Sequence, residues 1–120
     1  MNGRLPLSSH PVAASQARQF LTRTCAHLST TTLEVAHLLV SELVSNAVRH
    51  GQPDIVMTYA LHPDRLRIEV EDGDPTPPGQ PEFSVSAEDG RGLLIVSALA
   101  DRWGMRPLPR GKSMWFDLAL

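Results

Sequence analysis

Cysteine, lysine and long apolar runs are scarce in this 120-residue sequence, and each shortage excludes a class of function. Cys25 is the only cysteine, which excludes an intramolecular disulfide and a metal site of the CxxC type. Lysine and arginine number 11 and lie scattered along a chain of net charge −2, so the clustered positive charge of a duplex DNA reader is missing. No stretch approaches the roughly 18–20 apolar residues that cross a bilayer, and the beginning lacks the layout of a secretory signal. We therefore expect a cytoplasmic protein with no direct nucleic-acid partner and no membrane partner.

The composition that is present is that of one folded domain. The apolar fraction is 42% and the charged fraction 20%, both ordinary for a globular protein, and the length is a common domain size. Pro6 and Pro11 interrupt the beginning, which predicts a loose leader over residues 1–11 and a single domain over 12–120. We expect Cys25 to be a small buried residue in the first helix of that domain.

Hydrophobic periodicity predicts a mixture of helices and strands. Thr31 and Glu34 match a capping box at the start of the second helix, and Gly51 follows its end. Four prolines and three glycines between residues 72 and 90 predict a long loop. The expected elements are helices over 12–27, 32–50 and 93–100, and strands over 55–61, 66–71, 102–108 and 112–120. This order predicts an α+β two-layer sandwich, with the helices on one face of a mixed, largely antiparallel sheet.

The second helix carries an unusual polar stripe. Glu42, Asn46 and His50 recur every four residues and so share one side, and Arg49 lies beside the last of them. The remaining surface of this segment is mostly apolar. A stripe of this kind often only faces water, but here it combines a base, an amide oxygen, a cation and an imidazole. That combination suits a site for a metal-bound phosphate.

Two weaker motifs follow. Asp72 and Gly73 end a predicted strand, where a carboxylate often only makes a turn but could also accept a hydrogen bond from the exocyclic amine of a purine. Gly90, Arg91 and Gly92 precede the third helix, whose first backbone N–H groups could hold phosphate oxygens. The glycine spacing matches neither a Rossmann fingerprint nor a Walker loop.

Together these motifs resemble, in order and spacing, the GHKL superfamily of ATP-binding domains, whose members share the Bergerat fold and include the histidine kinases. The stand-alone bacterial anti-sigma-factor kinases similar to SpoIIAB and RsbW look closest. The resemblance covers residues from about 12 to the C-terminus. The matching residues are Glu42, Asn46, Ala47 and His50 in the first box, Asp72 in the second, Gly90, Gly92 and Leu93 in the third, and Gly111, Lys112, Ser113 and Phe116 in the closing strand.

The resemblance implies Mg²⁺ and ATP as cofactors. On the second helix, Asn46 would be the Mg²⁺ ligand, and Glu42 the general base that polarises the attacking hydroxyl or water. Arg49 and His50 would lie near the phosphates, although His50 could equally be structural.

The remaining motifs would bind other parts of the nucleotide. Asp72 would accept a hydrogen bond from the adenine amine, with Gly73 allowing close approach. Ser113 would donate its hydroxyl near the adenine edge or a phosphate. The segment 75–89 would be an ATP lid. The hinge of that lid and the phosphate cradle would comprise Gly90, Arg91, Gly92 and Leu93.

The function implied is that of a serine/threonine protein kinase that phosphorylates a small anti-anti-sigma protein and sequesters a sigma factor. The alternative is a non-catalytic switch in which ATP controls partner binding. It is favoured by the order Asp72-Gly73-Asp74 in place of Asp-x-Gly, and by a lid without lysine. A third interpretation is the catalytic fragment of a histidine kinase, but the sequence contains no pair of dimerisation and phosphoacceptor helices. A further alternative is a structural domain that binds no nucleotide. Related regulators are often dimers, so a homodimer is possible.

Overall fold

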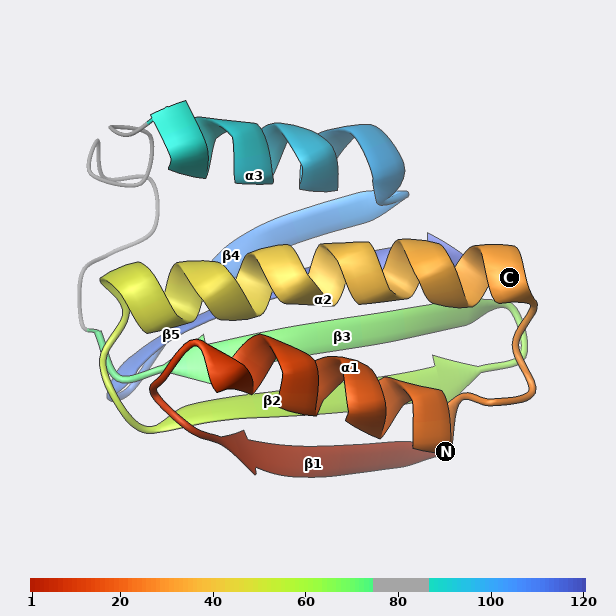
Figure 1. Cartoon of the computed structure of the whole chain (residues 1–120), viewed down its shortest axis with the longest axis horizontal. Coiled ribbons are helices and arrows are strands. Elements are labelled where there is room, and N and C mark those ends of the chain that lie inside the picture. Colours follow the sequence, from red (N-terminus) through yellow and green to blue (C-terminus); the bar gives the residue numbers. More distant parts are fainter. Residues whose placement is uncertain (75–86) are drawn as a thin grey trace.

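Three helices and five strands form two layers in the computed structural model, which describes residues 1–74 and 87–120 (Figure 1). For residues 87–91 and 93 the structure describes the backbone alone. The elements are β1 (Asn2–Leu7), α1 (Val12–Thr24), α2 (Thr30–His50), β2 (Ile55–His62), β3 (Arg65–Asp72), α3 (Ala87–Leu99), β4 (Arg102–Leu108) and β5 (Gly111–Ala119). None of the helices in the described part is long and apolar enough to cross a membrane.

The strands form one sheet in the order β1-β2-β3-β5-β4. Every adjacent pair is antiparallel, so the expected two-layer α+β fold is confirmed, while the sheet is antiparallel throughout rather than mixed. The helices cover one face of the sheet (Figure 1). The core between the layers is built from buried side chains of both, among them Leu21, Leu39, Leu43, Met57, Ile68 and Phe116. Cys25 is fully buried in this core, as expected.

The first residues form a strand, so the prediction of a loose leader over residues 1–11 is wrong for Asn2–Leu7. β1 pairs with β2 in the register Gly3 to Tyr59 and Leu5 to Met57. Pro6 suggested a break because proline cannot donate to a strand ladder. An edge strand tolerates proline, and β1 is at the edge of the sheet.

Helix α2 begins at Thr30, and its N-cap is Ser29 rather than Thr31. The Ser29 hydroxyl accepts a hydrogen bond from the Thr32 N–H at 3.1 Å. Ser29 has the extended backbone of an N-cap residue, with φ −60° and ψ 152°. The helix is therefore capped by the Ser29 hydroxyl, two residues before the N-cap of the predicted capping box of Thr31 and Glu34. Residues 29–32 are all serine or threonine, so the sequence did not show which of them is the cap.

Helix α3 begins at Ala87, earlier than predicted. The segment from Gly90 to Gly92 thus lies inside the helix and not before it. Since only the first backbone N–H groups of a helix lack an internal partner, the predicted phosphate cradle at a helix start does not coincide with these glycines. The prediction failed because two glycines in three residues usually break a helix.

The other face of the sheet carries a layer of charged pairs. The Arg67 guanidinium donates two hydrogen bonds to the Asp117 carboxylate, at 2.7 and 2.8 Å, and lies 4.2 Å from the centre of the Trp115 ring. Glu69 accepts a hydrogen bond from the Ser113 hydroxyl at 3.2 Å and pairs with Arg106 at 3.0 Å.

Candidate functional site

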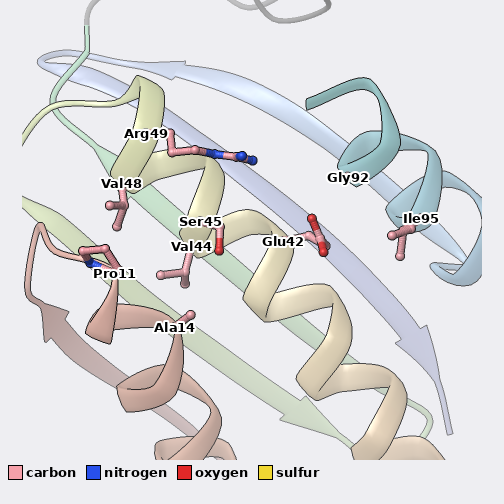
Figure 2. Close-up of a pocket in the computed structure, with 9 residues that line it drawn as sticks. All are labelled: Pro11, Ala14, Glu42, Val44, Ser45, Val48, Arg49, Gly92 and Ile95. Atoms are coloured by element: carbon pink, nitrogen blue, oxygen red, sulfur yellow. The ribbon is translucent and has the colours of Figure 1, made fainter. Parts of the chain in front are cut away.

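A cavity of about 560 Å³ lies beside α2, between the start of α1 and α3. Its size is that of a small-molecule site. Figure 2 shows Glu42 and Arg49 on the side of α2 toward α3, whereas Val44 and Val48 lie toward α1. The cavity thus has a polar side and an apolar side. Its lining residues are Pro11, Ala14, Glu42, Val44, Ser45, Val48, Arg49, Gly92 and Ile95.

Glu42 of α2 lies against Gly92 of α3 in this cavity. A Cβ atom added to Gly92 would lie 2.7 Å from Oε2 of Glu42, so only glycine leaves this carboxylate undisturbed. Gly92 is itself buried. The helical spacing predicted the stripe on α2, and the fold brings the predicted base against a glycine of the third motif.

Asn46 lies one turn after Glu42 and faces β5. Its side-chain Nδ2 donates a hydrogen bond to the sulfur of Met114 at 3.1 Å. A small pocket joins Glu42, Asn46 and Arg49 to Gly92 and Met114. Because the hydrogen bond uses the amide nitrogen, the amide oxygen is the atom of Asn46 that could face a cation.

Asp72 is buried at the end of β3 and forms an ionic cluster. Lys112 Nζ lies 3.1 Å from Oδ1 of Asp72 and 3.2 Å from Oδ2 of Asp74, and the Lys112 side chain is only 1% exposed. The Asp74 N–H also donates to Oδ1 of Asp72 at 2.8 Å. A buried ammonium needs such partners, so Asp74, the extra acid of the second motif, serves here to balance Lys112.

The end of α2 packs directly on Asp72. Gly51 has φ −87°, so it does not occupy the left-handed region that glycine often supplies after a helix. A Cβ at Gly51 would lie 2.5 Å from Cγ of Asp72, which is why glycine is needed here. Gly73 donates its N–H to the Gln52 carbonyl at 2.7 Å. The second motif is thereby anchored beside the end of the first.

The structure does not bring all the predicted residues together. His50 is exposed at the last position of α2 and is not among the residues that line the cavity. Ser113 is fully buried, and its hydroxyl bonds to Glu69 on the sheet face away from the helices. Strand alternation explains this placement, because Ser113 follows Lys112 and precedes Met114, which both point toward the helix layer.

Some predictions concern parts that the structure does not describe. Residues 75–86 of the predicted lid lie outside the described ranges, while 87–89 open α3. The backbone of Gly90, Arg91 and Leu93 belongs to α3, and their expected contacts with a nucleotide stay predictions.

Two site residues received no role from the sequence. Lys112 was part of the closing-strand motif and Met114 lay within it. Both come from β5, whose register places Lys112 opposite Asp72 and Met114 opposite Val70. The alternation of β5 was visible in the sequence, but its pairing with β3 was not. Only that register shows which of its side chains reach Asp72 and Asn46.

A metal ion would find few protein ligands here. Among the side chains that the structure describes, those of residues 1–74, 92 and 94–120, no cluster of three or more histidine, cysteine, aspartate or glutamate residues could hold one. A Mg²⁺ ion held by one amide oxygen, with phosphate and water oxygens completing its shell, is compatible with this donor set, since Mg²⁺ often keeps waters and binds through substrate phosphates.

Comparison with known proteins identifies the family. The histidine kinase-like ATPase domain family matches residues 7–116, whereas no curated protein matches the chain. The structure of the RsbU and RsbW domains of Rv1364c from Mycobacterium tuberculosis is similar, with a TM-score of 0.73 and 23% identity over 98% of this chain and 31% of that chain. The histidine kinase domain of the blue-light activated kinase EL346 from Erythrobacter litoralis has a TM-score of 0.61 and 17% identity over 92% of this chain and 60% of that one.

Both solved structures are therefore longer than the segment they share with this chain. At these identities the likeness concerns the fold, whereas the match over residues 7–116 covers most of the sequence. The chain belongs to the family of histidine kinase-like ATPase domains.

Proposed function

We propose that this protein is a Mg²⁺- and ATP-dependent serine/threonine kinase of the anti-sigma-factor type, which phosphorylates a small anti-anti-sigma protein. Membership of an ATPase-domain family implies ATP as the ligand, and the likeness to a structure containing an RsbW domain supports this type of regulator. The observation that carries the proposal is the Glu42 carboxylate, which lies in the wall of the cavity against Gly92, with Arg49 in the same lining.

In this proposal Glu42 is the general base. Its carboxylate faces the cavity from α2, where it would take the proton of an acceptor hydroxyl as that oxygen bonds to the γ-phosphorus and the bond from the γ-phosphorus to the departing ADP breaks. Arg49, two turns further along α2, would stabilise the negative charge on the transferring group. Pure nucleotide binding needs no base at this position.

Asn46 and Asp72 would hold the nucleotide on either side of this centre. The amide oxygen of Asn46 would contact Mg²⁺, which when bound neutralises charge on the phosphate oxygens. Asp72 does not line the cavity. In this proposal the adenine lies beyond Asn46, toward the end of β3, where Lys112 and the Asp74 N–H hold the orientation of the Asp72 carboxylate.

One observation favours a second function, a non-catalytic ATP-dependent interaction switch. Lys112 already occupies Oδ1 of Asp72 and is almost completely buried. An adenine amine would share this carboxylate with an ammonium group that already neutralises it, so the carboxylate would be a weaker acceptor. Binding would then persist, but with less interaction energy to hold ATP in the geometry that transfer requires. The two functions differ in whether Glu42 affects turnover.

The test replaces Glu42 with alanine and measures two quantities on the same protein. Release of labelled phosphate from γ-labelled ATP should fall by about 100-fold or more, the usual contribution of a positioned base. ATP affinity by calorimetry should change by no more than about twofold, because a base adds little ground-state binding. Glu34→Ala, an exposed change on the same helix, is the matched control and should leave both quantities unchanged.

The outcomes separate the hypotheses. Turnover by Glu42→Ala at the wild-type rate would contradict the kinase and leave the switch. Binding of ATP that requires Mg²⁺ and weakens in Asn46→Ala would support the nucleotide site in either case. No binding heat and no thermal stabilisation by ATP under any metal condition would refute both functions.

A further inference from the structure

A second pocket, separate from the site at Glu42, lies between α1 and α2. It is a groove of about 340 Å³ lined by Ser15, Arg18, Gln19, Thr22, Arg23 and His37. The buried residues of α1, Ala13, Ala17 and Leu21, point to the core. The groove residues occupy the other side of this helix, so the groove opens away from the sheet. We call it the α1–α2 groove.

The ionisable side chains that line this groove are all basic. Its lining contains two arginines and a histidine, three further side chains that can donate hydrogen bonds, and no acidic residue. Helix α1 has no aspartate or glutamate at all. The titratable residue nearest to His37 along α2 is Glu34, one turn earlier and exposed, and it is not among the lining residues.

Part of the groove is a rigid polar network. Arg18 donates from one terminal nitrogen to the Ser41 hydroxyl at 2.8 Å, and Ser41 donates to the His37 carbonyl at 2.7 Å. The Thr22 hydroxyl donates to the Arg18 carbonyl at 3.1 Å and lies 2.9 Å from Nε2 of His37. These contacts fasten α1 to α2, which accounts structurally for Arg18, Thr22, Ser41 and His37.

The network does not account for the accumulated positive charge. A guanidinium has five N–H donors, and the contact to Ser41 uses one terminal nitrogen of Arg18. Arg23 is exposed one turn further along the same groove and adds a second guanidinium without an acidic neighbour in the lining. The planar fork of a guanidinium group suits the oxygens of a phosphate, which can accept two parallel N–H hydrogen bonds.

The pKa of His37 reflects this electrostatic environment. Partial burial, followed by the nearby Arg18 charge, lowers the pKa of His37 below its usual value, with a smaller opposing contribution from a hydrogen bond to the Arg18 backbone. A neutral imidazole beside an uncompensated arginine gains a proton more easily once an anion arrives. His37 can therefore act both as a ligand and as a reporter of binding.

We propose that the α1–α2 groove binds a phosphate group through the guanidinium groups of Arg18 and Arg23, with His37 as a further hydrogen-bonding partner. The chemistry is the same for free inorganic phosphate and for a phosphorylated serine or threonine side chain. The site is independent of the cavity at Glu42, since the two pockets share no lining residue.

The experiment follows the ring resonances of His37 by NMR while inorganic phosphate is added to the full chain. We expect a saturable shift and a higher His37 pKa than in chloride at equal ionic strength. Arg18→Lys keeps the charge but loses the planar fork, and should weaken binding about tenfold. Arg23→Ala should weaken it about threefold. Arg23 is exposed, so this variant should fold normally.

Two controls localise the response. Arg49→Ala removes a cation from the other cavity and should leave the His37 response unchanged. Arg110→Ala, at an exposed turn, should also have no effect. A second titration with a phosphoserine peptide distinguishes the sources, because tighter binding than phosphate assigns a phosphorylated side chain, while equal or weaker binding assigns the free anion.

A response no larger than that to chloride would overturn the proposal. It would also be overturned if Arg18→Lys and Arg23→Ala both retained the wild-type affinity, because the shift would then arise elsewhere. A merely structural role of the network predicts that Arg18→Lys lowers stability while phosphate leaves His37 unaffected.

Discussion

Gly92 and Glu42 come from different helices, and their contact allows the base to be tested without removing it. Gly92→Ala would place a methyl group 2.7 Å from Oε2 of Glu42. The carboxylate is the flexible end of a side chain, so it should move and the fold should survive. Alanine also favours helix by up to about 1 kcal/mol over glycine.

We therefore expect Gly92→Ala to be as stable as the wild type or slightly more stable, while ATP turnover falls by about tenfold or more. Thermal unfolding and phosphate release measure the two effects. Ser97→Ala, an exposed change in the same helix, controls for helix propensity. Unchanged turnover would show that the position of the Glu42 carboxylate does not matter for the reaction.

Asp117 links stability to pH on the other face of the sheet. The hydrogen bonds from Arg67 lower the pKa of Asp117, and the charges of Arg67, Arg65 and Arg102 act in the same direction, against the opposing effect of burial. A carboxyl whose folded pKa is lowered contributes stability above its unfolded pKa of about 3.9, and this contribution is lost as pH falls through the folded value.

Asp117→Asn should therefore lower the free energy of unfolding by about 1–2 kcal/mol at pH 7, allowing for the partial exposure of Arg67. The difference from wild type should shrink as the pH falls below about 4. Urea denaturation at several pH values measures it, with the exposed Glu34→Gln as control. A constant difference across the acid range would contradict the role of this ion pair.

At the scale of elements, the structure and the sequence motif assign different N-cap residues to α2, Ser29 and Thr31. Ser29→Ala removes the hydroxyl that accepts from the Thr32 N–H and should cost about 1 kcal/mol of stability. Thr31→Ala should cost less than about 0.5 kcal/mol, because Thr31 is exposed and is not the cap. Urea denaturation compares the two. The reverse order would restore the capping box of Thr31 and Glu34.

The same helix shows which elements are predictable from sequence. Its apolar positions, from Ala36 to Ala47, recur at helical spacing and indicated both the helix and its buried side. The ends were less certain, since four adjacent serine and threonine residues can each cap a helix. For α3, the low helix propensity of glycine suggested that the helix starts after Gly92, whereas in the structure it begins at Ala87.

At the scale of the whole molecule, β1 completes the sheet edge. Deleting residues 1–8 would remove the strand that pairs with β2, together with Leu5 and Leu7, and leave β2 as an exposed edge. We expect a loss of about 2–4 kcal/mol of stability and a tendency to aggregate.

Chemical denaturation and light scattering measure these effects. Leu7→Ser should reproduce part of the loss, because Leu7 packs against the core, whereas Arg4→Ser at an exposed position of the same strand should not. A truncated chain as stable as the full one would return residues 1–11 to the status of a loose leader.

The candidate site residues on α2 were predictable because helical periodicity alone places Glu42, Asn46 and Arg49 near one another. Asp72 was also recognisable, from its place at a strand end. Their partners were not, since Lys112 and Met114 depend on the pairing of β5 with β3, which joins residues about 40 positions apart. Ser113 shows the consequence, because a shift of one residue along a strand turns a side chain to the opposite face.

The sequence by itself determined the order of most elements and the residues of the polar stripe, because these depend on local spacing and propensity. Its motifs also resembled those of the family that the comparison identified. The tertiary structure decided that residues 2–7 form a strand, that Lys112 neutralises Asp72 and Asp74, and that Ser113 faces away from the site. These outcomes depend on strand register and on burial between layers, and contacts distant in sequence leave no periodic signal in the chain.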